Sequence, residues 1–366
     1  MTLASTPRLA TIPVVEITPG GQVQHAIDDR ARAQALRDGC LAWLPRAARV
    51  MLPAVDAMTR RWLERSASPY VAEIAAIAAA LDYSGIWFLN GCYQWGCTAL
   101  AREEDEGMPW LVRTLDWPFP GLGRHVEIAR MRGPAGAFDT VTWPGFVGAL
   151  TASAPGRFAA CINQAPLRRR TRHPWLRPYD IARNALATAR IRFIPPDHLL
   201  RDVLETCGSF DEARHRLETT PVARPVIFTL AGCRRGERCV IERTEQGFES
   251  RDQDTGAAND WRRSLPAWEA RVSSQAMFTR SYEQAAERNL ARKQQLAAWP
   301  GAFADGAFAW VTPPVLNTFT RLAVEMCPGK GVLRAVGYET LPGCELAQPV
   351  THSRELTAAV LASGLA

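Results

Sequence analysis

The sequence has little of what metal, redox and membrane-spanning proteins require. Its nine cysteines contain no CxxC pair and its six histidines no HExxH pattern, so neither a zinc site nor a thiol redox centre is indicated. We therefore expect no metal and no organic cofactor. No run approaches the roughly 20 apolar residues of a membrane-spanning helix, and residues 1–15 lack the continuous apolar segment of a secretory leader. We expect a cytoplasmic location on these grounds.

Lysine is also scarce. Lys293 and Lys330 are the only two, so arginine carries almost all of the positive charge behind the formal net charge of +6 and the sequence pI of about 9.0. One dense cluster, LRRRTRHPWLR at 167–177, is either a solvated loop or a rim that meets an anionic head group or a membrane surface. No recognised nucleic-acid-binding module accompanies the charge, so we expect no nucleic-acid partner.

Length and composition fit one large domain, since the 366 residues are 47% hydrophobic and 22% charged. Apolar spacing predicts a helical front, with helices over 24–38, 43–66 and 70–82. Strand-like runs follow at 97–103, 110–116, 125–132, 138–143, 146–153 and 158–163. Further helices are predicted around 179–192, 197–207, 210–219 and 280–298. Strands and helices in this order predict an α+β protein.

The most informative motif is Gly96-Cys97-Thr98, followed by Arg113 and Asp116 in VRTLDW. Cleavage of the Gly96–Cys97 bond would give Cys97 a free α-amine beside its thiol. A thiol with a pKa of about 8.5 is mostly protonated at neutral pH, whereas an α-amine with a pKa of about 8 can accept its proton. One residue then supplies both nucleophile and base, and no histidine is needed.

The spacing of this motif predicts a β-hairpin. CTALARE and WLVRTLDW are short β-rich runs separated by the polar turn EEDEGMP. Cys97 would then begin one strand, and Arg113 and Asp116 would lie near the end of its partner. Taken alone, Cys97 is more typical of a buried, inert cysteine, and the spacing to the arginine and the carboxylate favours catalysis.

With these motifs the chain resembles the N-terminal-nucleophile cysteine hydrolases of the choloylglycine hydrolase superfamily, in particular the acid ceramidase and N-acylethanolamine-hydrolysing acid amidase branch. The resemblance covers most of residues 70–275, through GCT, VRTLDW, FVGALTASAPGRF, CINQ, AANDW and EAR. It implies a four-layer αββα sandwich. In that domain, residues 1–96 would be a helical N-terminal fragment, and residues 97–366 the catalytic fragment after autocleavage.

The resemblance also implies the roles of individual residues. Cys97 matches the nucleophile, and Arg113 and Asp116 match the pair that orients and activates it. Asn259 in AANDW matches an asparagine whose side-chain amide helps to form the oxyanion hole, and Arg271 in EAR matches a supporting arginine.

Two positions depart from the family pattern. Asn163 in CINQ is retained, but Gln164 stands where the ceramidase branch commonly has a glutamate, so a negative charge is lost. Thr114 stands where the family usually has an asparagine after the arginine. Either change could alter substrate preference or autocleavage, and we expect Asn163 and Gln164 to contact the substrate.

The function implied is hydrolysis of an N-acyl, lipid-like amide through a Cys97 thioester. Candidate walls of the acyl pocket are Trp117, Phe119, Trp143 and Phe146, which as large apolar residues are equally plausible as core. The expected partners are a small-molecule N-acyl amide, the two associated fragments and weak contact with a membrane surface.

Two alternatives share the same sequence features. The first is an acyltransferase of the penicillin acyltransferase type, which would pass the acyl group to an amine instead of to water. The second is an uncleaved, non-catalytic binding protein on the same fold, which Gln164 and Thr114 leave open.

Overall fold

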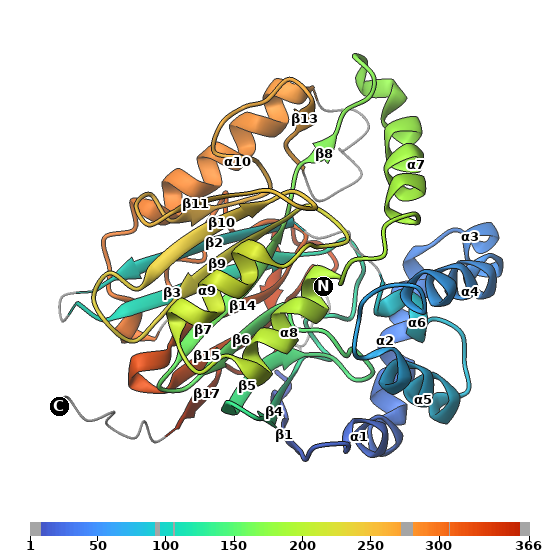
Figure 1. The fold of residues 1–366 in the computed structure, drawn as a ribbon, viewed down its shortest axis with the longest axis horizontal. Helices are drawn as coiled ribbons and strands as arrows, with labels where there is room; N and C mark the ends of the chain where they lie inside the picture. Colours follow the sequence, from blue (N-terminus) through green and yellow to red (C-terminus); the bar gives the residue numbers. More distant parts are fainter. Residues whose placement is uncertain (1–8, 92–95, 105–106, 272–280, 307, 359–366) are drawn as a thin grey trace, which may run out of the picture.

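Two β-sheets form the centre of the fold (Figure 1). The structure is a computed structural model and describes residues 9–91, 96–104, 107–271, 281–306 and 308–358. The larger sheet contains, in spatial order, β1 (Val14–Ile17), β4 (Glu127–Gly133), β5 (Gly136–Thr142), β6 (Thr151–Ala154), β7 (Phe158–Gln164), β9 (Val226–Ala231), β10 (Arg238–Arg243) and β11 (Phe248–Arg251). The second contains β12 (Gly256–Ala257), β2 (Gly96–Glu103), β3 (Pro109–Asp116), β14 (Thr320–Cys327), β15 (Val332–Glu339) and β16 (Gln348–Pro349), with β17 (Arg354–Thr357) also paired to β15.

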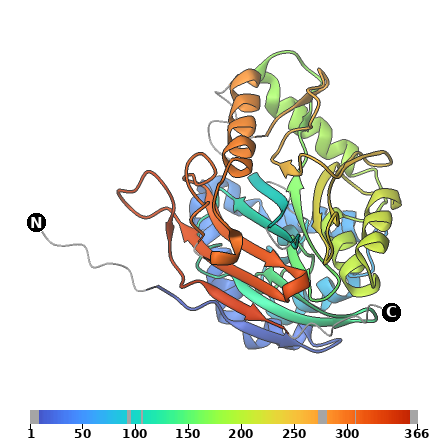
Figure 2. The same cartoon turned by 90° about the vertical axis from the view of Figure 1, so that its left-hand side faces the viewer.

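Helices cover the outer faces of the two sheets, which pack on one another through β2, β3, β7 and β9. Helices α8 (Pro196–Thr206) and α9 (Phe210–Thr219) lie on the larger sheet, and α10 (Tyr282–Ala297) lies on β2 and β12 of the other (Figures 1 and 2). This order of layers confirms the predicted αββα sandwich. Within the described part of the chain, no helix combines the length and the apolar character that crossing a membrane requires.

The predicted hairpin of β2 and β3 is confirmed and lies in the middle of the second sheet. Its antiparallel register pairs Gly96 with Asp116, Cys97 with Leu115, and runs to the pair of Glu103 with Pro109. All eight positions of β3 are buried because a sheet or a helix covers each of its faces. This explains why the strand reads as a continuous apolar run with only a few polar residues.

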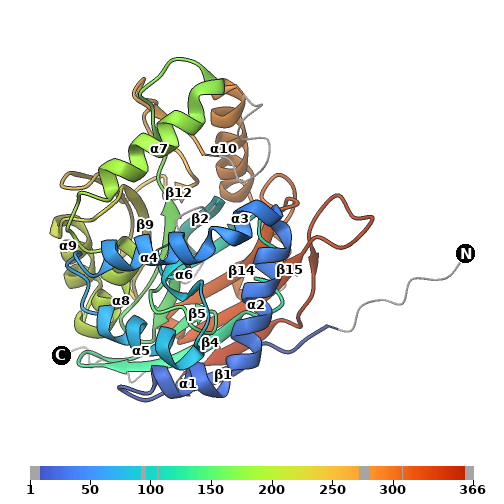
Figure 3. The ribbon, with the colours of Figure 1, turned by 90° about the vertical axis from the view of Figure 1, so that its right-hand side faces the viewer.

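The predicted helical front forms a separate group along one side of the sandwich (Figure 3). Its helices are α1 (Gln22–Asp28), α2 (Arg30–Trp43), α3 (Arg46–Val50), α4 (Leu52–Leu63), α5 (Val71–Leu81) and α6 (Ile86–Leu89). The helix predicted over 70–82 is confirmed. Those predicted over 24–38 and 43–66 are each two helices. Pro53 explains the second break, because proline is tolerated in the first turn of α4 but would remove a hydrogen bond inside a longer helix.

The strand predicted over 146–153 is shorter than expected, since β6 begins only at Thr151. The preceding segment instead wraps around the buried side chain of Asn90, which donates to Gly145 O at 2.9 Å and accepts from Val147 N at 2.7 Å. Gly145 has φ +85°, and a Cβ on Gly148 would lie 2.5 Å from the Asp197 carboxylate. Both glycines therefore fit this loop and not an extended strand.

A short extension projects beyond the sandwich near α10. It consists of β8 (Leu167–Arg168) paired with β13 (Trp268–Glu269), together with α7 (Arg177–Thr188). The basic cluster at 167–177 falls here, so it follows directly from the end of β7. Among the described residues there are also the short helices η1 (Pro174–Leu176), η3 (Phe303–Asp305) and η4 (Pro328–Lys330).

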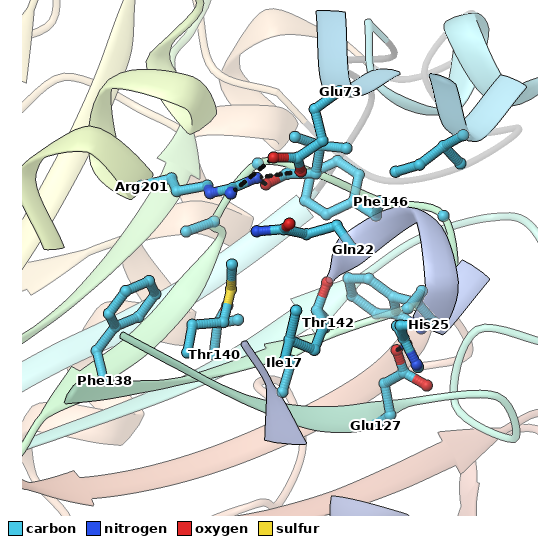
Figure 4. Close-up of a pocket in the computed structure, with 18 residues that line it drawn as sticks. Ile17, Gln22, His25, Glu73, Glu127, Phe138, Thr140, Thr142, Phe146 and Arg201 are labelled. Carbon is cyan, nitrogen blue, oxygen red and sulfur yellow. Dashed lines mark hydrogen bonds and ion pairs between the residues drawn. The ribbon is translucent and has the colours of Figure 1, made fainter. Parts of the chain in front are cut away.

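Ion pairs fasten the front helices to the sandwich. Glu73 of α5 contacts Arg201 of α8 at 2.6 Å, and His25 contacts Glu127 of β4 at 2.8 Å (Figure 4). Arg32 of α2 also contacts Glu127, at 2.7 Å. Apolar packing accompanies these pairs, in a cluster that joins α4 and α5 to the segment before β6. These contacts join residues on opposite sides of the Gly96–Cys97 bond.

His25 should make the stability of this fold depend on pH. Burial lowers its pKa, but the hydrogen bond and the charge of Glu127, with Asp29 adding to them and Arg32 opposing, raise the pKa above 6.5. Protonation therefore stabilises the folded chain below about pH 6.5, and this contribution is lost as pH rises through the folded-state pKa. We expect the melting temperature to fall more between about pH 5.5 and about pH 8 in the parent than in His25→Gln.

The matched control is His215→Gln, because His215 is an exposed residue of α9. It should keep the parent's pH dependence. A His25→Gln chain with the same pH dependence as the parent would show that the contact with Glu127 does not contribute.

Candidate active site

Cys97 lies at the head of β2 with its thiol fully buried between the two sheets. Because side chains on paired strands alternate together, Arg113, opposite Ala99, leaves β3 on the same face as Cys97. Its Nη2 donates to Cys97 Sγ at 2.8 Å. The guanidinium is fixed by two further bonds, from Nη1 to Thr151 Oγ1 at 2.5 Å and from Nη2 to Ile162 O at 3.1 Å.

The thiol is held in its protonated form by its surroundings. Burial raises the pKa of Cys97 above its usual 9.0, whereas the positive charges of Arg113 and Arg292 and the backbone N–H of Gln164 lower it by less. Asp116 raises it further. The thiolate is the reactive form, so the site needs a base close to the sulfur.

The backbone nitrogen of Cys97 donates to Asn259 Oδ1 at 2.7 Å. Asn259 reaches this position because β12, just before it, pairs with Ala99 and Leu100 of β2. Its own side-chain Nδ2 donates to Gln164 O at 2.9 Å. Asn259 therefore contacts both the nitrogen that cleavage would free and the end of β7.

Asp116 lies on the opposite face of β3 from Arg113, since the two are three residues apart. Its carboxylate accepts from Arg292 Nη1 at 3.1 Å, Asn317 Nδ2 at 2.8 Å and Thr320 Oγ1 at 3.0 Å. Burial raises its pKa above 3.8, although Arg292 and these hydrogen bonds lower it. The structure thus brings Arg113 to the thiol and Asp116 to the far side of the same strand.

Arg292 joins these two parts of the site. Its Nη2 donates to Asn259 Oδ1 at 3.1 Å and to Asn289 Oδ1 at 2.6 Å, while Nη1 reaches Asp116. Asn289 and Arg292, both in α10, were not predicted from the sequence. A signal was present, because Ala285, Asn289, Arg292 and Leu296 recur at helical spacing and share the buried face of α10. Two polar side chains on that face indicate buried partners.

The other predicted site residues lie around the end of β7. Arg271 Nε donates to Ala165 O at 2.8 Å, and its backbone nitrogen donates to Asn259 O at 2.9 Å. Asn163 Nδ2 donates to Ala258 O at 3.2 Å, while its buried Oδ1 has no hydrogen-bond partner among the described residues. Asn163, Gln164 and Arg271 therefore lie close to Asn259.

A groove begins at this end of β7 and has an open volume of about 1400 Å³. Gln164, Ala165 and Arg271 line its inner end, α7 and β8 form one wall, and α4 and α6 form the other. Phe88 lines this groove and also a second, almost wholly apolar cavity of about 640 Å³. Trp117 and Phe119 line that second cavity together with α2.

Trp143 and Phe146 line a third cavity instead, of about 440 Å³, on the outer face of the larger sheet under α1, α5 and α8 (Figure 4). Cys97 lines none of these three cavities. Trp143 Nε1 donates to Leu122 O at 2.7 Å, which fixes the ring there. These two predicted pocket residues therefore line a different cavity from Trp117 and Phe119.

One group of described residues, His25, Asp29 and Glu127, places three metal-ligand atoms close together. Arg32 already forms ion pairs with both carboxylates, at 2.6 and 2.7 Å. A cation would have to displace that guanidinium, so these residues do not fit a metal site.

The two sheets with their covering helices, and Cys97 at the head of a central strand, define an α+β sandwich. No family model matches the chain. It is 28% identical over 186 residues to an N-acylethanolamine-hydrolysing acid amidase of Oryctolagus cuniculus, covering 49% of each, and 29% identical over 167 residues to the acid ceramidase of Mus musculus, covering 40% and 39%.

These homologues confirm the resemblance predicted from the motifs. The chain spans about half the length of the curated relatives it matches first. Among solved structures, a Caenorhabditis elegans ortholog of the N-acylethanolamine amidase aligns with TM-score 0.48 and 18% identity over 64% of this chain and 93% of its own. Penicillin V acylase from Agrobacterium tumefaciens aligns with TM-score 0.39 and 12% identity over 66% and 83%.

The buried pair of Arg292 and Asp116 should matter for stability. Their side chains are 3% and 0% exposed, so removing one partner leaves the other charge buried without compensation. In a Cys97→Ala background that stays one chain, Arg292→Gln should lower the free energy of unfolding by about 3–5 kcal/mol, measured by urea titration.

Adding Asp116→Asn to Arg292→Gln removes both charges and should recover part of this loss. A double variant whose loss equals the sum of the two single losses would show that the two side chains act independently.

Proposed function

We propose that this chain is a cysteine amidase activated by cleavage of its Gly96–Cys97 bond. The observation that carries the proposal is the hydrogen bond from the Cys97 nitrogen to Asn259. The thiol of the same Cys97 accepts a hydrogen bond from Arg113. After cleavage this nitrogen would be an α-amine already held by an acceptor. The sequence relatives, named as amidases and ceramidases, support amide hydrolysis.

Cleavage itself would use the same thiol. Cys97 Sγ attacks the carbonyl carbon of Gly96, and the acyl group moves from the Cys97 nitrogen to its sulfur. Water then hydrolyses the thioester and leaves the Gly96 carboxylate and the free amine of Cys97. No base from outside residue 97 is needed for later turnovers.

The positive charge of Arg292 favours the form of the freed amine that can act as a base. Arg292 donates to the same Asn259 oxygen that accepts from the Cys97 nitrogen, so its charge lies close to the amine. A nearby positive charge lowers an amine pKa and favours the neutral form, which can accept a proton. Asp116 balances Arg292 and limits this effect.

In each turnover the thiol proton passes to the α-amine, and the thiolate attacks the substrate carbonyl. Asn259 Nδ2 and backbone N–H groups stabilise the oxyanion, the C–N bond breaks, and the protonated amine gives its proton to the leaving amine. Water then releases the acyl group. Asn259 Nδ2 donates to Gln164 O in the uncleaved chain, so this step requires that bond to be exchanged for the oxyanion.

The cavities beside the site fit the two halves of an N-acyl amide. The apolar cavity at Trp117 and Phe119 suits an acyl chain, and the groove from Gln164 suits the amine portion. The exposed ring of Trp175, 70% accessible within the basic cluster, supports weak contact with a membrane surface.

Active protein should consist of two fragments, residues 1–96 and residues 97–366, because the catalytic amine exists only after cleavage. The fragments should stay associated through the contacts between the front helices and the sandwich. Intact and denaturing mass spectrometry measure both points. Cys97→Ala should remain one chain, and full turnover by an intact chain would refute the mechanism.

Asn259 can be tested with two variants that separate its acceptor from its donor. Asn259→Ala removes both, and it should lower kcat about a hundredfold or more with KM little changed, because the oxyanion forms only in the transition state. Asn259→Asp keeps an acceptor for the Cys97 nitrogen but loses the donor. An Asn259→Asp enzyme that cleaves itself yet turns over slowly supports the oxyanion role, and near-normal kcat in both variants would exclude it.

A further inference from the structure

Asn289 of α10 is a fully buried asparagine whose side chain uses all of its hydrogen-bonding capacity. Its Nδ2 donates to Ala285 O and to Arg271 O, both at 2.8 Å. Its Oδ1 accepts from Asn259 N at 2.9 Å and from Arg292 Nη2 at 2.6 Å. An asparagine amide has two donor hydrogens and two acceptor lone pairs, so each of them has a partner here.

These partners determine the orientation of the Asn289 amide. The oxygen and nitrogen ends of a carboxamide are almost the same size, so packing alone does not distinguish them. Carbonyl oxygens only accept hydrogen bonds, and therefore Ala285 O and Arg271 O have to face Nδ2. Oδ1 is then turned toward Arg292, whose guanidinium only donates. Main-chain carbonyls thus fix which end of Asn289 meets Arg292.

Arg292 in turn restricts the orientation of the Asn259 amide. Its Nη2 donates to Asn259 Oδ1 at 3.1 Å as well as to Asn289. Because a guanidinium has no acceptor, Asn259 cannot turn its own N–H donors toward Nη2 without losing this bond. Asp116 accepts from Nη1 at 3.1 Å and so holds the guanidinium from its other end. Asn259 therefore keeps Oδ1 toward the Cys97 nitrogen and Nδ2 away from it.

Both proposed roles of Asn259 depend on this orientation. With Oδ1 beside it, the freed amine of Cys97 can donate one hydrogen to Asn259 and keep its lone pair for the thiol proton. A reversed amide would place an N–H donor against that lone pair. It would also turn an oxygen toward the developing oxyanion, so the base and the oxyanion donor would be lost together.

We propose that Asn289 is a positioning residue, which sets the orientation of the Asn259 amide and holds Arg292 beside the Cys97 amine. This proposal rests on the proposed amidase function. The four hydrogen bonds of Asn289 reach the main chain of α10, Arg271, Asn259 and Arg292, so its effect on the reaction is exerted through these groups. Its loss should therefore reduce turnover more than substrate binding.

A double-variant cycle tests whether Asn289 acts through Asn259. Asn289→Ala should lower kcat, normalised to the cleaved fraction, roughly tenfold or more with KM little changed, because the oxyanion donor is no longer held in place. In an Asn259→Ala background the same change should lower kcat by about threefold at most, since the group that it positions is already absent. Equal losses in both backgrounds would overturn the proposal and leave the amidase function intact.

Asn289→Asp gives a pH readout that a merely structural residue would not move. The new carboxylate would lie beside Arg292, whose charge keeps it ionised. Its negative charge offsets the positive charge that lowers the pKa of the Cys97 amine, so the amine pKa should rise. Since the neutral amine is the base, the acidic limb of kcat/KM should move up by about one pH unit, and an unshifted limb would overturn the proposal. The other charged groups around Arg292 and the Cys97 thiol are the same in parent and variant, namely Arg113, Asp116, Asp260 and Arg288.

Asn90 offers the matched control, because it is also a buried asparagine held by main-chain groups. It donates to Ile86 O and Gly145 O, both at 2.9 Å, and accepts from Val147 N at 2.7 Å, partners that belong to α6 and to the loop before β6. Asn90→Ala should lower the free energy of unfolding, yet change kcat by the same factor with and without Asn259. Asn90→Asp should leave the acidic limb in place, and a shift as large as that of Asn289→Asp would overturn the proposal.

The side chain of Asn259 gives a readout that does not require turnover. In uncleaved Cys97→Ala protein with isotope-labelled asparagine, its NH2 group should give one pair of nuclear magnetic resonance signals, identified by their loss in Asn259→Asp. Adding Asn289→Ala should broaden or split this pair, because the amide can then exchange between two orientations. An unchanged pair would overturn the positioning role. A changed pair in a protein that hydrolyses no N-acyl amide would instead refute the amidase function alone.

Discussion

The hydrogen bond between the Cys97 nitrogen and Asn259 is the contact on which the rest of the site depends. It joins β2 to the segment after β12, and Asn259 in turn bonds to β7 through Gln164 and to α10 through Asn289. Four parts of the fold that are far apart in sequence therefore meet at one residue, Asn259. Any shift of α10 or of β7 would reach Cys97 through Asn259.

The two faces of β3 carry side chains of opposite charge. Arg113 points between the sheets and contacts the sulfur, whereas Asp116 points toward α10 and balances Arg292. Each charge is fully enclosed, and each has fixed hydrogen-bond partners from other elements. A buried charge without partners would cost several kcal/mol, so these networks also restrict how the layers can pack.

Local sequence signals predicted the parts of the site that lie within one hairpin. The spacing from Cys97 to Arg113 and Asp116, with a polar turn between, is set by strand pairing and therefore reads directly from the sequence. Arg292 and Asn317 lie 176 and 201 residues further on and reach Asp116 only through the tertiary packing of α10 and of the segment before β14. No local pattern encodes such a contact.

The aromatic residues are a second case in which the sequence does not determine the position of a side chain. Trp117, Trp143 and Phe146 are all large and mostly buried, which their sequence context indicates, but residue type does not say which cavity a ring will line. Trp117 follows β3 directly and lines the apolar cavity, while Trp143 follows β5 and lines the cavity on the outer face of the larger sheet. The strand that precedes each ring therefore decides which cavity it lines.

The groove at the end of β7 and the apolar cavity at Trp117 are both shared between the segments that precede and follow the Gly96–Cys97 bond. Helices α2, α4 and α6 supply walls to them, while Trp117, Phe119, β8 and α7 come from the other segment. If the bond is cut, no covalent link fixes the position of one wall relative to the other. The ion pairs at Glu127 and Arg201 lie away from Cys97, yet they would then contribute to substrate binding, because they fix the position of one wall against the other.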